Sequence, residues 1–148
     1  YEDALSKWFF LMFFMPIVTS AGGNSGTQAA SLVIRGLAIK EMSTIDVWRI
    51  LQKELLVGVG LGAFLAFIGF FGVSLWGLNA SVGLVVASSV VAVVLFGVVA
   101  GSMLPFVFEK LNFDPAVVSS PFISTLLDVT GILIYINFAL WIMGLSGS

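Results

Sequence analysis

One acidic side chain lies where charge is least stable. Asp128 is the only charged residue in the apolar stretch from Pro121 to Leu145. About 25 helical residues are enough to cross a hydrocarbon core of roughly 30 Å, so this carboxylate is predicted at membrane depth. A carboxylate there costs at least a few kcal/mol unless a partner neutralises it, and it is a functional-site hypothesis by default. The chemistry that it offers is the binding of a cation or a proton.

The sequence supplies no basic partner for Asp128 inside an apolar segment. A structural ion pair would need a Lys or Arg at the same depth, so the expected partner is a proton or a cation from solution. All six basic residues lie at the edges of apolar segments or in the links between them: Lys7, Arg35, Lys40, Arg49, Lys53 and Lys110.

A second polar group interrupts the first apolar segment. Asn24, Thr27 and Gln28 follow i, i+3, i+4 spacing, which places them on one face of a helix. Glycines beside them permit an unwound or closely approached backbone, which a membrane tolerates only where it is buried in protein or lines a wet cavity. The alternative for these polar residues is a set of interhelical hydrogen bonds, worth about 0.6 kcal/mol each. The glycines are Gly22, Gly23 and Gly26.

Polar and small residues also form a stripe around Asp128. Pro121 lies shortly before this stripe and can free carbonyl oxygens near 117–120, which become candidate ligands. We expect this stripe and the polar group of the first segment to form one site. The members of the stripe are Ser124, Asp128, Gly131 and Tyr135, with Thr125 on its flank.

Composition limits the classes of protein. The chain of 148 residues is 59% hydrophobic and 9% charged, whereas a soluble domain carries about 25% charged residues. It is therefore an integral membrane chain with no separate soluble domain. The absence of Cys and His excludes disulfides, thiolate catalysis and imidazole chemistry, and leaves no nucleophile–base pair for an enzyme. A formal charge of −2 gives no nucleic-acid footprint.

The same composition limits the metal. Any bound ion must be held by oxygen atoms, which favours Mg²⁺, Ca²⁺ or Mn²⁺. Mg²⁺ sheds water reluctantly and usually binds through one or two carboxylates plus several waters. One chain offers one carboxylate at membrane depth, so a two-fold dimer with two Asp128 side chains near its axis would match a divalent, hydrated ion.

The predicted fold class is all-α: a polytopic membrane helical bundle with four transmembrane helices in one ion-conducting domain, 1–148. Small residues in the second and third segments predict close packing of helix backbones. These residues are Gly58, Gly62, Ala66 and Gly69 in the second segment and Gly97 and Gly101 in the third. The predicted helices cover roughly 7–38, 47–78, 80–109 and 115–145.

The distribution of basic residues predicts the orientation. If the four segments alternate, Arg35, Lys40, Arg49, Lys53 and Lys110 fall on one side. The positive-inside rule places both basic links in the cytoplasm and both chain ends outside, in a multi-pass protein of the cell (inner or plasma) membrane. An outside start predicts that a preceding membrane helix is absent from this sequence.

Two long motifs resemble a known family. Met15-Pro16-Ile17-Val18, followed by Gly22-Gly23-Asn24-Ser25-Gly26-Thr27-Gln28-Ala29 and Arg35-Gly36-Leu37-Ala38, resembles the second membrane helix of the MgtE magnesium channels. Asp114-Pro115-Ala116-Val117-Val118-Ser119-Ser120-Pro121-Phe122, with Thr125-Leu126-Leu127-Asp128-Val129-Thr130-Gly131, resembles the fifth. The resemblance covers essentially the whole chain in the right order. It implies a homodimer in the lipid bilayer with a Mg²⁺ pore on the two-fold axis.

The resemblance also implies roles for individual residues. Asp128 would hold a hydrated Mg²⁺, the backbone carbonyl of Ser124 would assist, and Asn24 would line the narrow cytoplasmic side. Glu54 is a candidate ion contact at the cytosolic mouth, and an ordinary solvated charge is the alternative for it. The cytosolic regulatory domains of the family, among them a pair of CBS domains, are absent from this sequence. Further pore-lining residues are expected at Thr27, Gln28, Thr125, Gly131 and Ser120.

Three functions follow from this reading. The first is a passive Mg²⁺ channel, for which Mn²⁺, Co²⁺ and Ca²⁺ are alternative ions because size discrimination depends on pore geometry. The second is a proton- or sodium-coupled secondary cation transporter in which Asp128 binds the coupling ion. The third is a membrane anchor for a soluble domain that this sequence does not contain, in which Asp128 would have no role in ion handling.

Overall fold

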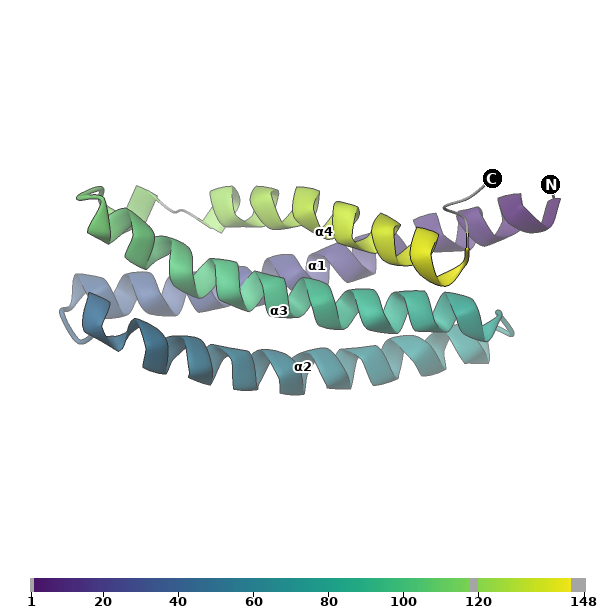
Figure 1. The fold of residues 1–148 in the computed structure, drawn as a ribbon, viewed down its shortest axis with the longest axis horizontal. Coiled ribbons are helices and arrows are strands. Elements are labelled where there is room, and N and C mark those ends of the chain that lie inside the picture. The colour runs from purple at the N-terminus through teal and green to yellow at the C-terminus, as the bar shows by residue number, and fades with distance from the viewer. Residues whose placement is uncertain (1, 118–119, 145–148) are drawn as a thin grey trace.

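The computed structural model describes the backbone of residues 2–117 and 120–144 and the side chains of residues 8–117 and 121–144. The described residues are helical and contain no strand, which confirms the all-α class (Figure 1). They form α1 (Glu2–Ala38), η1 (Thr44–Asp46), α2 (Val47–Leu75), α3 (Ala80–Lys110), η2 (Pro115–Val117) and α4 (Ser120–Ile142), where η marks a short 3₁₀ helix.

Some helix ends differ from the predicted ones. α1 begins at Glu2 and not near position 7, because residues 2–7 contain neither Gly nor Pro to stop it. α2 ends at Leu75 and not at 78, since Gly77 takes a φ of +70° and terminates the helix.

The fourth segment also begins later than predicted. Residues 115–117 form the separate turn η2, and α4 begins only at Ser120. Pro121 therefore lies in the first turn of α4, where its missing N–H breaks no helical hydrogen bond. The expected free carbonyls near 117–120 fall partly on 118–119, which lie outside the described residues.

Three of the four helices are long and apolar enough to cross a membrane. Within the described chain these spans are Thr44–Leu75, Ala80–Lys110 and Pro121–Ile142. α1 has 37 residues, and at 1.5 Å per residue it extends for roughly 55 Å. Length is therefore sufficient in α1 as well.

α3 is the centre of the bundle. It packs against α1, α2 and α4, and α1 also packs against α4 (Figure 1). In the most apolar part of each span, 56% of α3 is buried, compared with 28% of α4 and 17% of α2. α2 therefore packs against the bundle through one face, and the rest of its surface is exposed.

Glycines bring the backbones of α1 and α3 into direct contact. A Cβ on Gly97 would lie 2.5 Å from the carbonyl oxygen of Gly22, and a Cβ on Gly26 would lie 2.8 Å from the carbonyl oxygen of Gly97. A Cβ on Gly101 would overlap the carbonyl oxygen of Gly26. The sequence correctly predicted close packing at Gly97 and Gly101, but their partner is α1 and not α2. α1 stays helical through these glycines and is not unwound.

Glycines on α2 face α3 in the predicted manner. Gly58 and Gly62 are buried, and a Cβ on either would meet a valine of α3 within 3.3 Å or less. At Gly58 the contact is with the Val98 side chain, and at Gly62 it is with the backbone of Val91 at 3.3 Å, which is looser than the contact between α1 and α3. α2 is thus held by a shallow valine-lined seam.

A buried hydrogen bond joins α4 to α1. The Tyr135 hydroxyl donates to the carbonyl oxygen of Leu11 over 2.8 Å, and the Tyr135 side chain is 1% exposed. This bond lies far along α4 from its first turn, at the end of the bundle where α1 begins. It fixes the lateral position of α4 on α1 at the end opposite the basic residues.

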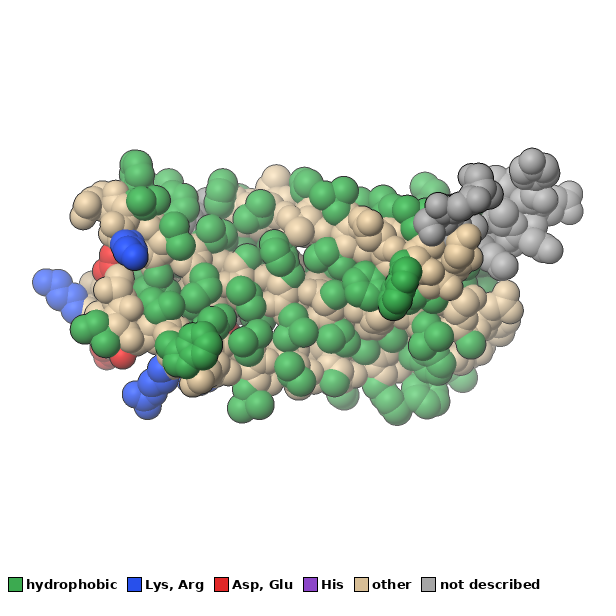
Figure 2. Space-filling model, in the orientation of Figure 1, with side chains coloured by type: hydrophobic (Ala, Val, Ile, Leu, Met, Phe, Trp, Pro, Cys, Tyr) green, Lys and Arg blue, Asp and Glu red, His purple; other side chains and the backbone are tan. Residues whose placement is uncertain are grey.

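The outer surface suits a bilayer. Large apolar side chains are exposed along the length of the bundle, while the described basic side chains gather at one end (Figure 2). Trp48 is exposed near the basic end, and Trp76 and Trp141 are exposed toward the opposite end. Tryptophans at both ends of an apolar surface are typical of the two membrane–water interfaces.

We predict that Gly101→Ala destabilises the bundle, because the new methyl group would collide with the backbone of α1 and the tight α1–α3 contact leaves no room for it. The expected cost is about 1–3 kcal/mol, the usual range for overpacking. The matched control is Gly60→Ala, since a Cβ on Gly60 meets nothing within 4 Å. Melting midpoints of the two purified variants in detergent measure the difference. Equal midpoints would contradict the close contact.

Candidate functional site

Asp128 opens onto a groove between α1 and α4. The groove has a volume of about 470 Å³ and combines polar and apolar side chains. The apolar part consists of Met15, Pro16 and Ile132. Oxygen- and nitrogen-bearing side chains form the rest. They are Thr19, Ser20, Asn24, Ser124 and Asp128, and Gly23 lies among them.

The carboxylate of Asp128 is exposed to this groove and faces no positive side chain in it. None of the described residues that line the groove is basic. Lys53 lines a different cavity, near the link between α1 and α2, and Arg35 is exposed in the last turn of α1. A negative charge that faces hydroxyl and amide groups attracts a cation or a proton into the groove.

Gly23 sets the distance between α1 and the acidic group of α4. A Cβ on Gly23 would lie 3.5 Å from Oδ1 of Asp128 and 3.8 Å from the hydroxyl oxygen of Ser124. Gly23 itself is buried. The lack of a side chain at this position therefore leaves space beside the carboxylate that any other residue would occupy.

Asn24 lies on a ridge between two grooves. Its side-chain amide donates to the hydroxyl oxygen of Ser20 over 3.3 Å, and both residues line the Asp128 groove. Both also line a second groove of about 610 Å³, which lies between α1 and α2. Gln28 lines only this second groove, together with Leu61 and Leu65 of α2. The polar face predicted for α1 is thus real, but it serves two grooves.

Of the remaining predicted pore residues, Thr27, Thr125 and Gly131 do not line the Asp128 groove. Thr27 is half-buried, and Thr125 is exposed and donates to the carbonyl oxygen of Pro121 over 2.8 Å. Gly131 is buried, with a Cβ position 3.3 Å from side-chain atoms of Thr19 and of a valine on α3. Ser120 begins α4, and its side chain lies outside the described residues.

Ser124 contributes two different oxygens. Its side chain lines the groove. Its carbonyl lies inside α4, where the helical pattern pairs it with the N–H of Asp128 and leaves one lone pair for a further donor. That remaining lone pair suits a water of a hydrated ion better than direct contact with a bare one.

Glu54 lies in a cavity of mixed charge at the basic end of the bundle. This cavity of about 320 Å³ is also lined by Glu41, Asp46, Arg49 and Lys53. Nowhere in the described chain do three or more His, Cys, Asp or Glu side chains come together as a metal-binding group. The acidic residues of this cavity share it with basic ones, whereas no described basic side chain lines the Asp128 groove.

The site is also lined by Thr19, Ser20 and Gly23, for which no binding role was predicted from the sequence. Ser20 lies four residues before Asn24, so helical spacing places the two on the same face, and Ser20 could have been predicted from this spacing. Thr19 donates to the carbonyl oxygen of Met15 over 3.2 Å, so its hydroxyl oxygen keeps acceptor capacity. Gly23 could be recognised only from the position of α4.

Comparisons with known proteins give a consistent result. The family model MgtE, described as a divalent cation transporter, matches residues 15–138. The magnesium transporter MgtE of Thermus thermophilus is 40% identical over 139 residues, that of Bacillus subtilis 38%, and that of Enterococcus faecalis 36%. Each match covers 94% of this chain and 31% of the relative. The chain thus spans about a third of the length of these curated relatives.

Proposed function

Because this chain belongs to the MgtE family of divalent cation transporters, we propose that it passes Mg²⁺ through the membrane with Asp128 as the central ion-binding carboxylate. The observation that carries the proposal is the exposed Asp128 carboxylate in a partly polar groove whose described lining residues include no basic one. The named activity of the relatives, magnesium transport, supports the choice of ion. Mn²⁺, Co²⁺ and Ca²⁺ are the competing ions.

The groove fits an ion that keeps its water. Mg²⁺ usually binds through one or two carboxylates and retains several waters. Asp128 supplies the charge, while the side chains of Ser20, Asn24 and Ser124 supply hydrogen-bonding groups for the waters. A dehydrated ion would need many more protein oxygens in its first shell than the groove offers.

A second copy of the chain completes the charge balance. One carboxylate leaves a divalent ion with an excess positive charge, and two Asp128 carboxylates across a two-fold axis neutralise it. The exposed ridge of Ser20, Asn24 and Gln28 supports this arrangement, because polar side chains on a membrane helix face protein or water and not lipid. The domain as a whole, 1–148, then acts as half of a homodimeric pore.

The membrane potential drives the ion inward. A divalent ion that crosses 100 mV gains about 4.6 kcal/mol, which needs no coupling to a second ion. With the basic end in the cytoplasm of a cell membrane, an ion that leaves the groove inward would move toward the end of the bundle that holds Arg35 and Lys110.

We predict that Asp128→Asn removes most of the divalent flux, because the amide keeps the shape of the side chain and removes its charge. The measurement is Mg²⁺ uptake into liposomes that contain the full-length protein, with a membrane potential and without a proton or sodium gradient. Asp46→Asn is the matched control for an equal loss of charge elsewhere. Unchanged uptake in Asp128→Asn would contradict the proposal. Uptake by the wild type only after a proton or sodium gradient is imposed would favour a coupled transporter.

We predict that Gly23→Ala lowers Mg²⁺ uptake about tenfold, since the methyl group would exclude one water from the carboxylate and a hydrogen bond to a charged group is worth roughly 1.5 kcal/mol. The contacts of 3.5 and 3.8 Å are ordinary van der Waals distances, so folding should be unaffected. Gly72→Ala is the control, because its Cβ position is open. The same liposome assay and a melting curve separate the two effects. Wild-type uptake in Gly23→Ala would show that this space is not used by the ion.

A further inference from the structure

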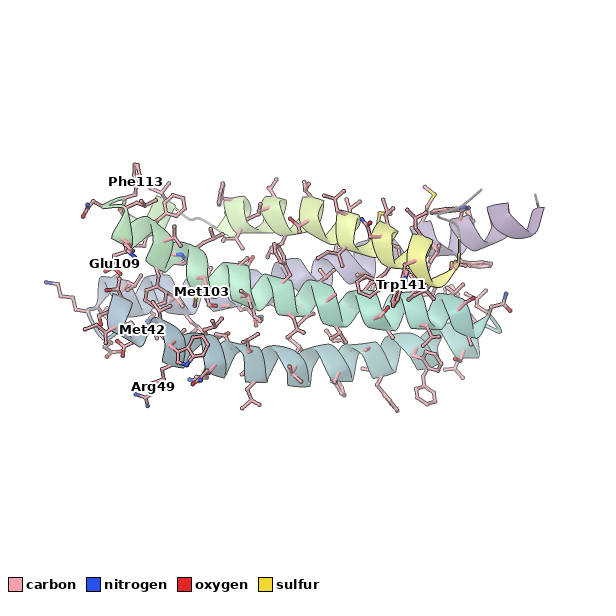
Figure 3. All side chains as sticks on the ribbon, viewed as in Figure 1. Met42, Arg49, Met103, Glu109, Phe113 and Trp141 are labelled. Carbon is pink, nitrogen blue, oxygen red and sulfur yellow. The ribbon has the colours of Figure 1, made fainter. Side chains whose placement is uncertain are left out.

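A second cavity lies at the basic end of the bundle, between the start of α2 and the end of α3. Its volume is about 470 Å³, and it shares no lining residue with the Asp128 groove. Figure 3 shows Met103, one of its lining residues, on α3 toward the end of the bundle where Arg49 lies in the first turn of α2. The full lining consists of Thr44, Val47, Met103, Phe106, Val107 and Lys110.

The lining of this cavity is divided into an apolar part and a cationic end. Val47, Met103, Phe106 and Val107 form an apolar surface, and Lys110 is the single charged residue among the described lining residues. Val107 is 48% exposed, so the apolar surface continues to the outside of the bundle. Such a combination matches an amphiphile with an apolar chain and an anionic head group.

No acidic side chain of the cavity neutralises Lys110. The adjacent Glu109 turns one carboxylate oxygen, Oε2, into the protein, where it is buried without a hydrogen-bond partner. The cavity that contains Glu54 differs in charge, because Glu41, Asp46 and Glu54 line it together with Arg49 and Lys53. The ammonium of Lys110 is therefore open to an anion that enters this cavity from outside.

We propose that this cavity binds an anionic phospholipid of the surrounding bilayer. The acyl chain lies against Val47, Met103 and Phe106, and the phosphate lies at the ammonium of Lys110 within reach of the Thr44 hydroxyl. Basic pockets between membrane helices at an interface are suited to anionic head groups. The exposed Trp48, next to Val47 in the sequence, marks the level of the head groups. This binding site is separate from the ion site and does not depend on it.

The test measures lipid binding to the full-length protein in detergent by native mass spectrometry, with phosphatidylglycerol and phosphatidylcholine at equal concentration. Wild type should prefer phosphatidylglycerol, and Lys110→Gln should lose about fivefold in binding that lipid, in line with roughly 1 kcal/mol per basic residue near a membrane surface. Lys53→Gln is the matched control, since it removes the same charge from the cavity that has acidic residues. It should retain the preference.

A further variant tests the apolar part. Val107→Trp would fill the cavity and should weaken the binding of both lipids, while melting curves verify that the variant is folded. Equal loss of phosphatidylglycerol in Lys110→Gln and Lys53→Gln would overturn the proposal in favour of general surface attraction. Unchanged binding in Lys110→Gln, or competition by free inorganic phosphate at the same site, would overturn it as well.

Discussion

The contact of Gly22 and Gly26 with Gly97 and Gly101 determines where every polar group of the bundle lies. In lipid the hydrophobic effect does not pull helices together, so α1 and α3 are held by van der Waals contacts. The glycines allow these contacts because they let the two backbones touch directly. Gly26 also faces Leu127 of α4, so the same turn of α1 receives two helices. Because α1 is held this close, α4 reaches Gly23 and carries Asp128 to it. A larger residue in this seam would move the carboxylate away from the polar face of α1.

This arrangement explains why a charged residue is tolerated in an apolar helix. Asp128 is exposed to a groove that is wide enough for water and has no basic side chain among its described lining residues. Its desolvation is therefore partial, and the groups around it hydrogen-bond to water as readily as to one another. The opposite arrangement, an ion pair within the bundle, would fix the charge and make it unavailable to an ion from solution.

The helical class, the number of helices and the special position of Asp128 could be predicted from the sequence, because apolar length and a lone carboxylate are local signals. The partner of Gly97 and Gly101 could not, since small-residue spacing shows that a helix packs closely but not which helix it meets. For the same reason, the sequence could not predict that the polar face of α1 serves two grooves. Asn24 and Gln28 share a face, but α4 lies on one side of this face and α2 on the other. The sequence predicted that Gly23 permits an unusual or closely approached backbone. In the structure its missing side chain leaves space beside the Asp128 carboxylate.

The exposed ridge of α1 changes character along its length, and this change locates the ion site in the membrane. Phe9 and Phe13 are exposed in the first half of the helix, while Ser20 and Asn24 are exposed in the second. The transition falls between Ile17 and Ser20, about one turn before Gly23. Exposed polar side chains therefore continue along the second half of α1 toward the basic end, where Leu32 is an exposed apolar exception, and large apolar side chains are exposed in the other direction. An ion at Asp128 therefore meets hydrogen-bonding groups for its waters from Thr19 and Ser20 on one side of Gly23 and from Asn24 and Ser124 on the other, and beyond Thr19 the groove lining becomes apolar at Pro16 and Met15.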